Sequence, residues 1–564
     1  MANKPVGSLP GTAASDPKRQ LLARLLKREG MPSQVPHRIL RRLGGTAAPL
    51  SFAQQRLWFL QQWEPANPVY NLARAYRLNG PLEGAWLARS LEAICQRHEI
   101  LRSTFPQVGD HPVQQFSQAT APQLHRVDLR QRPRRARDNE LARLVSTEAR
   151  HGFDLASEPL LRLSLVQLDT DDHVLILVAH QIICDGRSLD IFYRELETLY
   201  AKGGAVGRAS LPELSVQYAD YAAWQREALN DSALASELSY WKTRLGGQLP
   251  ILELPADRPR RALPTLLGAR RKFLIGEAVT GALKDLSRKS STTLFVTLMA
   301  AFKVLLFRYS AQADIIVGFP IATRDGPEME NLIGSFVNTL PLRSDLSGDP
   351  SFRTLLARVR VATQGALAHH DLPFERLVEE FPRERDLSRN PLFQTMFTFQ
   401  NRLPAELNLR GIHAEPIDCV SGMSKFDLTL SLGERDGRLL GSFEYSSELF
   451  DAPTIDRMIG HFQTLLNAIV ADPDRSISAL PLLRPAERRR ILVEWNDTAG
   501  YFPKDRCVHQ LVEAQALRTP NAVAVAWAGQ KLTYRELNRR ANRLARYLRQ
   551  GGLGPDKVAA VCVE

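Results

Sequence analysis

The stretch VLILVAHQIICDG, residues 174–186, combines the element that decides the fold with a group of polar residues directly behind it. Its first six residues are apolar without polar alternation, which predicts a strand buried on both faces, as in the sheet of an α/β domain. The run ends in a His, and an Asp and a Gly follow shortly after it. A buried strand that ends in these residue types predicts a site at that edge of the sheet.

The segments around this strand alternate between helices and strands, and the second half of the chain repeats the alternation. Residues 188–200 place their apolar side chains on one helical stripe, which predicts a helix. Residues 293–310 predict an interior helix, and residues 313–325 predict a short buried strand and its loop. Residues 252–264, rich in Pro and charge, predict a linker that crosses between the halves.

The bulk composition excludes several classes of protein. At 564 residues the chain is too long for one hydrophobic core, and its length predicts two to four domains. No run of about 18 apolar residues occurs, and the N-terminus lacks the apolar core of a signal peptide. The five cysteines show no metal-ligand spacing. We therefore expect no membrane partner, no metal site, free thiols and a cytoplasmic protein.

The net charge of +12 invites a nucleic-acid hypothesis. The densest basic stretch, RQRPRRAR at residues 130–137, contains a Pro and no aromatic residue, and no zinc or RNA-binding signature accompanies it. We interpret it as a solvated loop and expect no nucleic-acid partner. A basic surface would equally suit an acidic protein partner.

Seven stretches carry a resemblance to a known family. In chain order they are LSFAQQRLWFL (50–60), RHEILRSTF (97–105), HQIICDG (180–186), YADYAAWQ (218–225), IGSFVNTLPLR (333–343), HHDLPFERLV (369–378) and RDLSRNPLFQ (385–394). This series resembles the ordered motifs of condensation domains of nonribosomal peptide synthetases, over about residues 47–480. Near the C-terminus, VEWNDT (493–498) and LTYRELN (532–538) resemble the linker and first motif of an adenylation domain.

The resemblance implies a fold and a division of the chain. The expected fold class is α/β, with two chloramphenicol-acetyltransferase-like lobes in a V-shaped pseudo-dimer around a central tunnel, followed by a truncated adenylation-domain fragment. The expected segments are a leader with a short amphipathic helix (1–46), an N-lobe (47–225), a C-lobe (226–480), a linker (481–504) and the adenylation fragment (505–564). The helix of the leader is either a docking element for another protein or packed on its own domain.

The resemblance also implies a reaction and its partners. Such domains join an upstream acyl or peptidyl thioester to the α-amine of an aminoacyl thioester. Both substrates arrive on phosphopantetheine arms, one on an upstream donor carrier protein and one on a downstream acceptor carrier protein, so the domain itself would bind no cofactor and no metal. In a longer chain, an adenylation domain would be a partner in cis.

Gln181 departs from the family pattern, His-His-x-x-x-Asp-Gly, at the second His, which is the residue usually assigned to catalysis. An amide can accept a hydrogen bond from the amine and donate one to the oxyanion, but it cannot carry a proton away. Three readings follow: a condensing enzyme with altered efficiency, an impaired carrier-binding or gating module, and a related acyltransferase that acts on a free amine or alcohol.

The resemblance suggests roles for the neighbours of Gln181. His180 is either structural or directly catalytic. Asp185 is a candidate catalytic residue that we interpret as structural rather than as a base: it is expected to form a buried ion pair with an arginine of the second lobe, with Arg324 as the candidate and Arg343 as the runner-up. Gly186 is expected to let the backbone approach the thioester and to offer an N–H to the oxyanion.

Three further residues are candidates for the tunnel or the substrate. Arg187 stands where a large neutral residue is common in the family, and it would favour a neutral amine if it faced the tunnel. Ser188 is expected to cap the following helix. Asn338, polar within an apolar stretch, is a candidate tunnel or inter-lobe hydrogen-bonding group.

Overall fold

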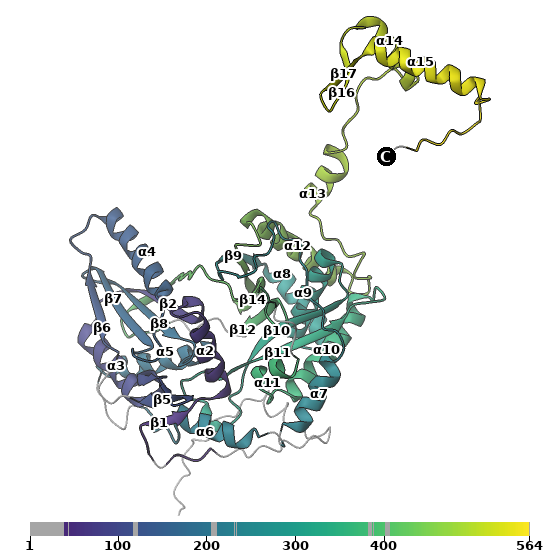
Figure 1. Ribbon diagram of the computed structural model, residues 1–564. Coiled ribbons are helices and arrows are strands. Elements are labelled where there is room, and N and C mark those ends of the chain that lie inside the picture. Colours follow the sequence, from purple (N-terminus) through teal and green to yellow (C-terminus); the bar gives the residue numbers. More distant parts are fainter. Residues whose placement is uncertain are drawn as a thin grey trace, which may run out of the picture. The chain divides into compact units, whose positions relative to one another are not determined.

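The computed structural model describes residues 39–42, 44–116, 122–204, 211–230, 232, 234–381, 386, 388–400 and 407–562. It divides into two compact units, one that ends at Arg484 and one that begins at Pro485. The expected N-terminal leader and its helix lie almost entirely outside the described residues. The two largest sheets of the larger unit form the centres of two lobes (Figure 1).

The first lobe is built on a five-stranded sheet in the order β13-β2-β8-β7-β6. Its central strand is β8, the strand expected from the sequence, and every residue from His173 to His180 is buried. A smaller sheet of β1, β3, β4 and β5 stands beside it. The bounds of these strands are Ala47–Pro49 (β1), Asn71–Asn79 (β2), Ser103–Thr104 (β3), Gln107–Val108 (β4), His111–Phe116 (β5), Leu124–Asp128 (β6), Leu161–Asp169 (β7), Asp172–His180 (β8) and His413–Ile417 (β13).

The second lobe is built on a six-stranded sheet in the order β11-β10-β12-β14-β15-β9. The strand expected within residues 313–325 is β10, which pairs antiparallel with β11 along its whole length. The bounds are Gly268–Ile275 (β9), Asp314–Ala322 (β10), Val337–Asp345 (β11), Thr395–Gln400 (β12), Leu428–Arg435 (β14) and Arg438–Ser446 (β15).

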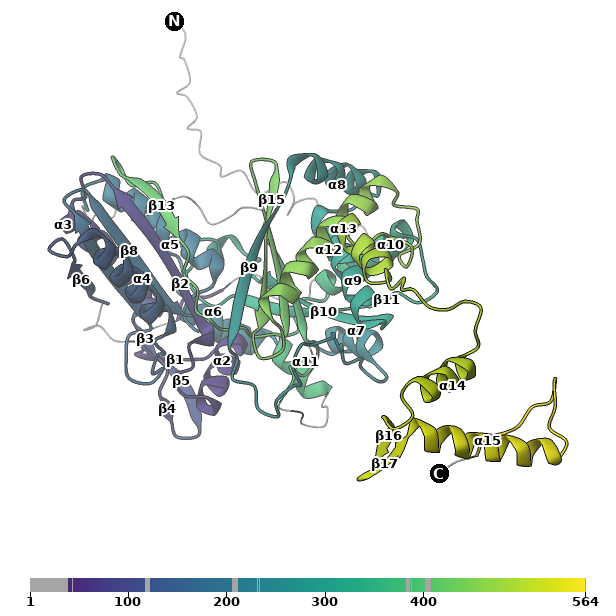
Figure 2. The same cartoon turned by 90° about the horizontal axis from the view of Figure 1, so that it is seen from above.

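The second half of the chain contributes segments to the first lobe. Strand β13 comes from the second half of the chain, but it pairs with β2 of the first sheet, and Figure 2 shows it in green beside the purple strand. Residues 329–336 and 407–412 also bury apolar side chains in the core of the first lobe. The first core is therefore completed by segments that lie beyond the expected lobe boundary at residue 225.

Amphipathic helices cover the sheets because each buries one apolar stripe. Helix α5 follows β8 and packs beside α3, whereas α9 is buried on nearly all sides in the second core. The bounds are Phe52–Trp63 (α2), Gly84–Arg97 (α3), Arg134–Arg150 (α4), Gly186–Ala201 (α5), Tyr218–Ala228 (α6), Ala235–Leu245 (α7), Glu277–Lys289 (α8), Leu294–Ser310 (α9), Phe352–Ala368 (α10), Phe374–Glu380 (α11) and Ala452–Ala471 (α12).

The smaller unit contains a two-stranded sheet and its helices. Their bounds are Pro485–Arg489 (α13), Val508–Arg518 (α14), Val523–Trp527 (β16), Gln530–Thr533 (β17) and Tyr534–Gln550 (α15). Across the described ranges of both units, no single helix is long and apolar enough to cross a membrane. Helices α8 and α9 are long and apolar enough only when they are taken together, and a bend of 106° separates them.

Candidate active site

A cavity of about 1780 Å³ is lined by residues of both lobes. The first lobe contributes the inner face of α2, residues 69–72 and Gln181, and the second lobe contributes α11, β12, β14, β15 and the segment 421–427. Ligand pockets commonly measure about 300–1,000 Å³, so this cavity has room for more than one reactant. Gln181 follows β8 directly, and its side chain therefore enters the cavity from the edge of the first sheet.

The imidazole of His180 is fully buried beside the cavity and is not among the residues that line it. Its Nδ1 accepts a hydrogen bond from the backbone N–H of Ile182 at 3.2 Å, so the only lone pair of the neutral ring is occupied. Nε2 is buried with no hydrogen-bond partner among the described residues. Burial, and after it the charge of Lys425, lowers the pKa of His180 to about 3. This geometry favours the structural alternative for His180.

The side chain of Gln181 is held by Lys425 of the second lobe, whose Nζ donates to Oε1 at 2.6 Å. The ammonium form of a lysine has hydrogen-bond donors only, so the amide turns its oxygen toward Lys425 and its NH₂ group away. The backbone N–H of Gln181 donates to the carbonyl of Tyr70 at 2.9 Å, which fixes the residue at its base. The orientation of the amide therefore follows from its partner.

Asp185 and Arg324, expected as an inter-lobe pair, are in contact away from the cavity. Arg324 donates to both carboxylate oxygens at 2.9 Å, and both residues are almost fully buried. Asp185 also accepts from the backbone N–H of Phe336 at 3.1 Å and from the Ser188 hydroxyl at 2.8 Å. The alternative partner, Arg343, pairs with Asp314 instead. Asp185 is therefore saturated with donors and ties the two lobes together.

The similarity of this chain to known proteins identifies its family. The condensation-domain family matches residues 45–492, which is most of the chain. The chain belongs to the condensation-domain family. A second match, to the AMP-binding enzymes, covers residues 512–564. The start of an adenylation domain therefore follows the condensation domain, as the sequence predicted.

Curated relatives of this condensation domain are peptide synthetases. A linear gramicidin synthase of Brevibacillus parabrevis is 45% identical over 518 residues, which are 92% of this chain and 7% of that protein. Phosphinothricin tripeptide synthetase PhsC of Streptomyces viridochromogenes is 40% identical over 555 residues, which are 98% of this chain and 51% of that protein. The chain thus spans about half or less of the length of these relatives.

Solved structures support the fold of the condensation domain. The X-domain from teicoplanin biosynthesis is 28% identical with a TM-score of 0.72, and the match covers 79% of this chain and all of that one. The four-domain nonribosomal peptide synthetase AB3403 matches with a TM-score of 0.77 over 91% of this chain and 40% of its own, at 24% identity. The predicted fold class, two α/β lobes followed by the start of an adenylation domain, is confirmed.

The other predicted residues of the condensation domain lie outside the described lining of the cavity. Arg187 and Gly186 are exposed in the first turn of α5, and a Cβ on Gly186 would meet no atom within 4 Å, so no close contact within the chain demands glycine. Ser188 is fully buried in the Asp185 cluster, and the helix cap is Asp185 rather than Ser188. Asn338 donates to the carbonyls of His370 and Leu372 at 2.9 Å.

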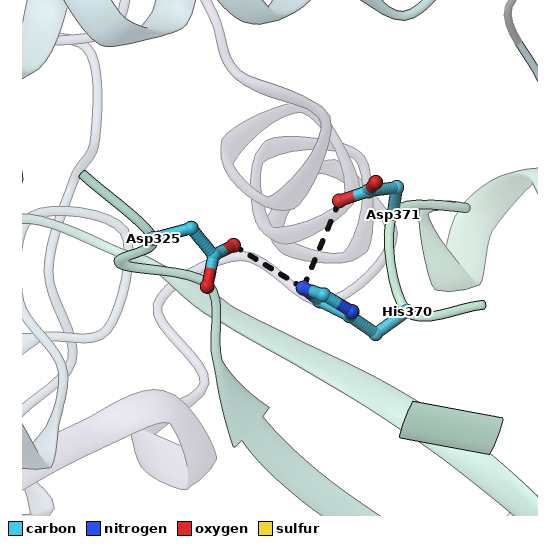
Figure 3. A group of neighbouring side chains, drawn as sticks. All are labelled: Asp325, His370 and Asp371. Carbon is cyan, nitrogen blue, oxygen red and sulfur yellow. Dashed lines mark hydrogen bonds and ion pairs between the residues drawn. The ribbon is translucent and has the colours of Figure 1, made fainter. Parts of the chain in front are cut away.

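A group of His370, Asp325 and Asp371 in the condensation domain resembles a metal site in composition (Figure 3). His370 Nδ1 lies 2.7 Å from the carbonyl of Leu367, and Nε2 lies 3.2 Å from Asp325 and 3.7 Å from Asp371. Both nitrogens face acceptors, so both carry hydrogens and the ring offers no lone pair to a metal. Burial lowers the pKa of His370, but the hydrogen bond that its ring donates to Asp325 and the two carboxylate charges outweigh burial and raise the pKa to about 9.

Sequence reasoning missed Lys425 and Glu444, two charged residues of the cavity. Lys425 is 244 positions from Gln181 in the chain and precedes β14 in the stretch SKFDLTLSL. Glu444 lies within β15, the neighbour of β14. The available signal for Lys425 was a charged residue just before a strand of alternating apolar and polar residues, which by itself is typical of a strand end at the surface.

Proposed function

We propose that this chain forms an amide bond between an acyl or peptidyl thioester and the α-amine of an aminoacyl thioester. The observation that carries the proposal is the cavity between the lobes, into which Gln181 presents an oriented amide at the end of β8. Its volume of about 1780 Å³ leaves room for a donor and an acceptor together. The peptide synthetase relatives support a peptide product.

The substrates of this reaction are proposed to arrive on carriers. The thioesters would be held on phosphopantetheine arms of an upstream donor carrier and a downstream acceptor carrier, and the adenylation domain that begins at the C-terminal side would supply the acceptor amino acid in cis. Under this proposal the condensation domain holds no cofactor of its own. The match of this chain with the larger AB3403 synthetase is consistent with such an arrangement of domains.

Alignment of the two reactants is proposed to supply most of the rate. Holding reactants in line can contribute up to ~7–11 kcal/mol, whereas a general base contributes about 10² to 10⁴ in rate. The Gln181 NH₂ group, which faces away from Lys425, is a donor that can stabilise the oxyanion on the thioester carbonyl. The domain is therefore proposed to condense its substrates without the usual second His, at a reduced rate.

A single-turnover assay with both carriers loaded tests the proposal, with product read by intact-protein mass spectrometry. The chain is compared with Gln181→His. Amide product from both proteins, within about tenfold, supports condensation carried by alignment. Product only from Gln181→His means that the cavity is intact and the present chain is impaired. Absence of product from both overturns the proposed function.

A second candidate function, that of a binding module, is favoured by one solved structure of similar fold. The X-domain from teicoplanin biosynthesis has been solved in a complex with OxyB, and it matches this chain at 27% identity with a TM-score of 0.71. A relative of this fold therefore binds another protein. If this chain has that role, it binds loaded carriers without forming product, and the same assay run beside a carrier-binding titration separates the two candidates.

A further inference from the structure

Lys425 is the titratable residue that touches Gln181 in the described part of the cavity. Its Nζ lies 2.6 Å from Gln181 Oε1 and 4.5 Å from the centre of the Tyr70 ring. The lysine is half-buried, and it reaches the end of β8 from the opposite lobe. The ammonium or amine group therefore stands beside the position at which the family pattern has its second His.

The other groups around the end of β8 are unsuited to accept a proton. Gln181 is an amide and does not titrate near neutral pH. The lone pair of His180 is occupied by the N–H of Ile182, and its Nε2 is buried in a ring that packs edge-on against Tyr70 and Phe153. Asp185 is saturated by Arg324, Ser188 and a backbone N–H outside the cavity. Among the described side chains that contact the Gln181 side chain, Lys425 is therefore the group that can change its protonation state.

We propose that Lys425, as a neutral amine, accepts the proton that the attacking α-amine loses, and so replaces the missing imidazole. This assignment rests on the proposed condensation function. A neutral lysine keeps one N–H for Gln181 Oε1 and retains its lone pair for the substrate. The same contact would align the base with the donor NH₂ of Gln181, so one pair of side chains would serve both the nucleophile and the oxyanion.

The surroundings of Lys425 make its neutral form more accessible than that of an exposed lysine. Burial lowers its pKa to about 8, Glu444 on β15 opposes this shift, and Arg56 on α2 adds to it. Tyr70 lies beneath the amine and has a raised pKa through burial, so it stays neutral, and His180 stays neutral because its pKa is lowered. About a tenth of Lys425 is therefore neutral at pH 7, and about half at pH 8.

The proposed step balances in protons and electrons. The α-amine nitrogen bonds to the thioester carbonyl carbon, and the carbonyl electron pair moves to oxygen. The nitrogen then loses a proton to Lys425 Nζ, the carbonyl re-forms, and the carbon–sulfur bond breaks with its electron pair on sulfur. The thiolate takes the proton from Lys425. An α-amine, this lysine and a thiol have pKa values within about one unit of one another, so neither transfer is strongly uphill.

The test is the pH dependence of single-turnover condensation by the 564-residue chain, compared with Lys425→Arg. The probes are N-acetylcysteamine thioesters: an N-acetyl-aminoacyl donor and an aminoacyl acceptor, drawn from panels with one member for each proteinogenic amino acid. Arginine keeps the positive charge and the donors but never becomes neutral at these pH values. Ionisation of the acceptor amine is common to both proteins and cancels in the ratio of their rates.

The ratio of the rates, wild type over Lys425→Arg, is expected to rise about tenfold per pH unit below pH 8 and to level off above it. A ratio that does not change with pH overturns the assignment, because it means that the lysine only positions Gln181. In that case Lys425→Met loses rate at every pH while Lys425→Arg keeps it. The control variant Lys272→Arg, at an exposed residue of β9, is expected to match the wild type at all pH values.

The same Lys425→Arg substitution in a Gln181→His background shows whether the substitution merely disturbs the fold. It also separates the role of Lys425 from the proposed condensation function. In a Gln181→His background, the restored imidazole can accept the proton, so Lys425→Arg is expected to lose at most about threefold there. An equally large loss in both backgrounds overturns the assignment. If neither the wild type nor Gln181→His forms product, the proposed function itself fails and the assignment falls with it; product with a constant ratio rejects the role of Lys425 alone.

Discussion

Arg324 donates from two guanidinium nitrogens to the two carboxylate oxygens of Asp185, each at 2.9 Å, and this contact joins the loop after β10 to the start of α5. The Ser188 hydroxyl closes the cluster, and Phe336 lies under the guanidinium at 4.2 Å. A carboxylate that is saturated by donors and buried outside the cavity cannot act as a base. In this condensation domain the Asp of the motif therefore holds the lobes together.

Replacement of Arg324 by Met is expected to destabilise the larger unit by about 3–5 kcal/mol, because the buried carboxylate of Asp185 loses its charge partner. Urea unfolding measures the change. The matched control, Arg353→Met, removes an exposed pair with Asp474 and is expected to change stability little. Equal effects of the two substitutions would contradict an architectural role for the Asp185 pair.

Gln181→Glu is expected to slow condensation at pH 7 and to move its pH dependence to higher pH. A carboxylate in place of the amide oxygen would form an ion pair with Lys425, which favours the charged lysine and raises its pKa above the value of about 8. The measurement is the single-turnover rate between pH 6 and about 10. The control is Gln181→Asn, which removes the contact without adding charge, and for which a lower rate with an unshifted profile is expected.

His370 is expected to make folding stability depend on pH. Its pKa rises from 6.5 to about 9 on folding, because its hydrogen bond with Asp325 and the charges of Asp371 and Asp325 outweigh burial. A group with a raised folded-state pKa contributes stability that is complete below pH 6.5 and is lost as the pH rises through 9. The melting temperature of the wild type relative to that of His370→Gln is expected to fall across this window, as thermal unfolding of the two proteins measures.

The control for this window is His413→Gln, at an exposed residue of β13, which should leave the wild-type curve unchanged. Addition of zinc or magnesium provides a second check. Because both ring nitrogens of His370 face acceptors, metal is expected to leave the melting temperature unchanged. A metal-dependent increase that His370→Gln abolishes would show that the group of three side chains binds an ion after all.

Lys303 is expected to give a pH dependence of opposite sign. It is fully buried in α9, burial lowers its pKa from 10.5 to about 7, and its Nζ donates to the carbonyls of Ile315 and Leu342. A neutral amine has two N–H groups, which satisfy both carbonyls. Because the unfolded state binds more protons between pH 7 and 10.5, stability from this group rises across that window and is least below it. The urea-unfolding free energy of the wild type relative to that of Lys303→Met should therefore rise across that window, and a constant difference would refute this account.

Local patterns predicted the elements that depend only on nearby residues. The apolar run at 174–179 predicted β8, and the stripe at 188–200 predicted α5, because strand burial and helical amphipathicity are visible as periodicity. The pairing of Asp185 with Arg324 came from a family resemblance and not from a pattern. The sequence predicted Ser188 as the cap of α5. In the structure Asp185 is the cap, because its carboxylate is already held at the first turn by Arg324 and accepts the N–H of Ser188.

By itself, the sequence determined the two α/β halves, the position of the motif at a strand end and the loss of the second His at Gln181. The packing of the chain settled that β13 completes the first sheet, that the lone pair of His180 accepts the N–H of Ile182, and that Lys425 meets Gln181. Periodicity records which face of an element is buried. It does not record which distant side chain meets that face, because such contacts depend on how the lobes pack.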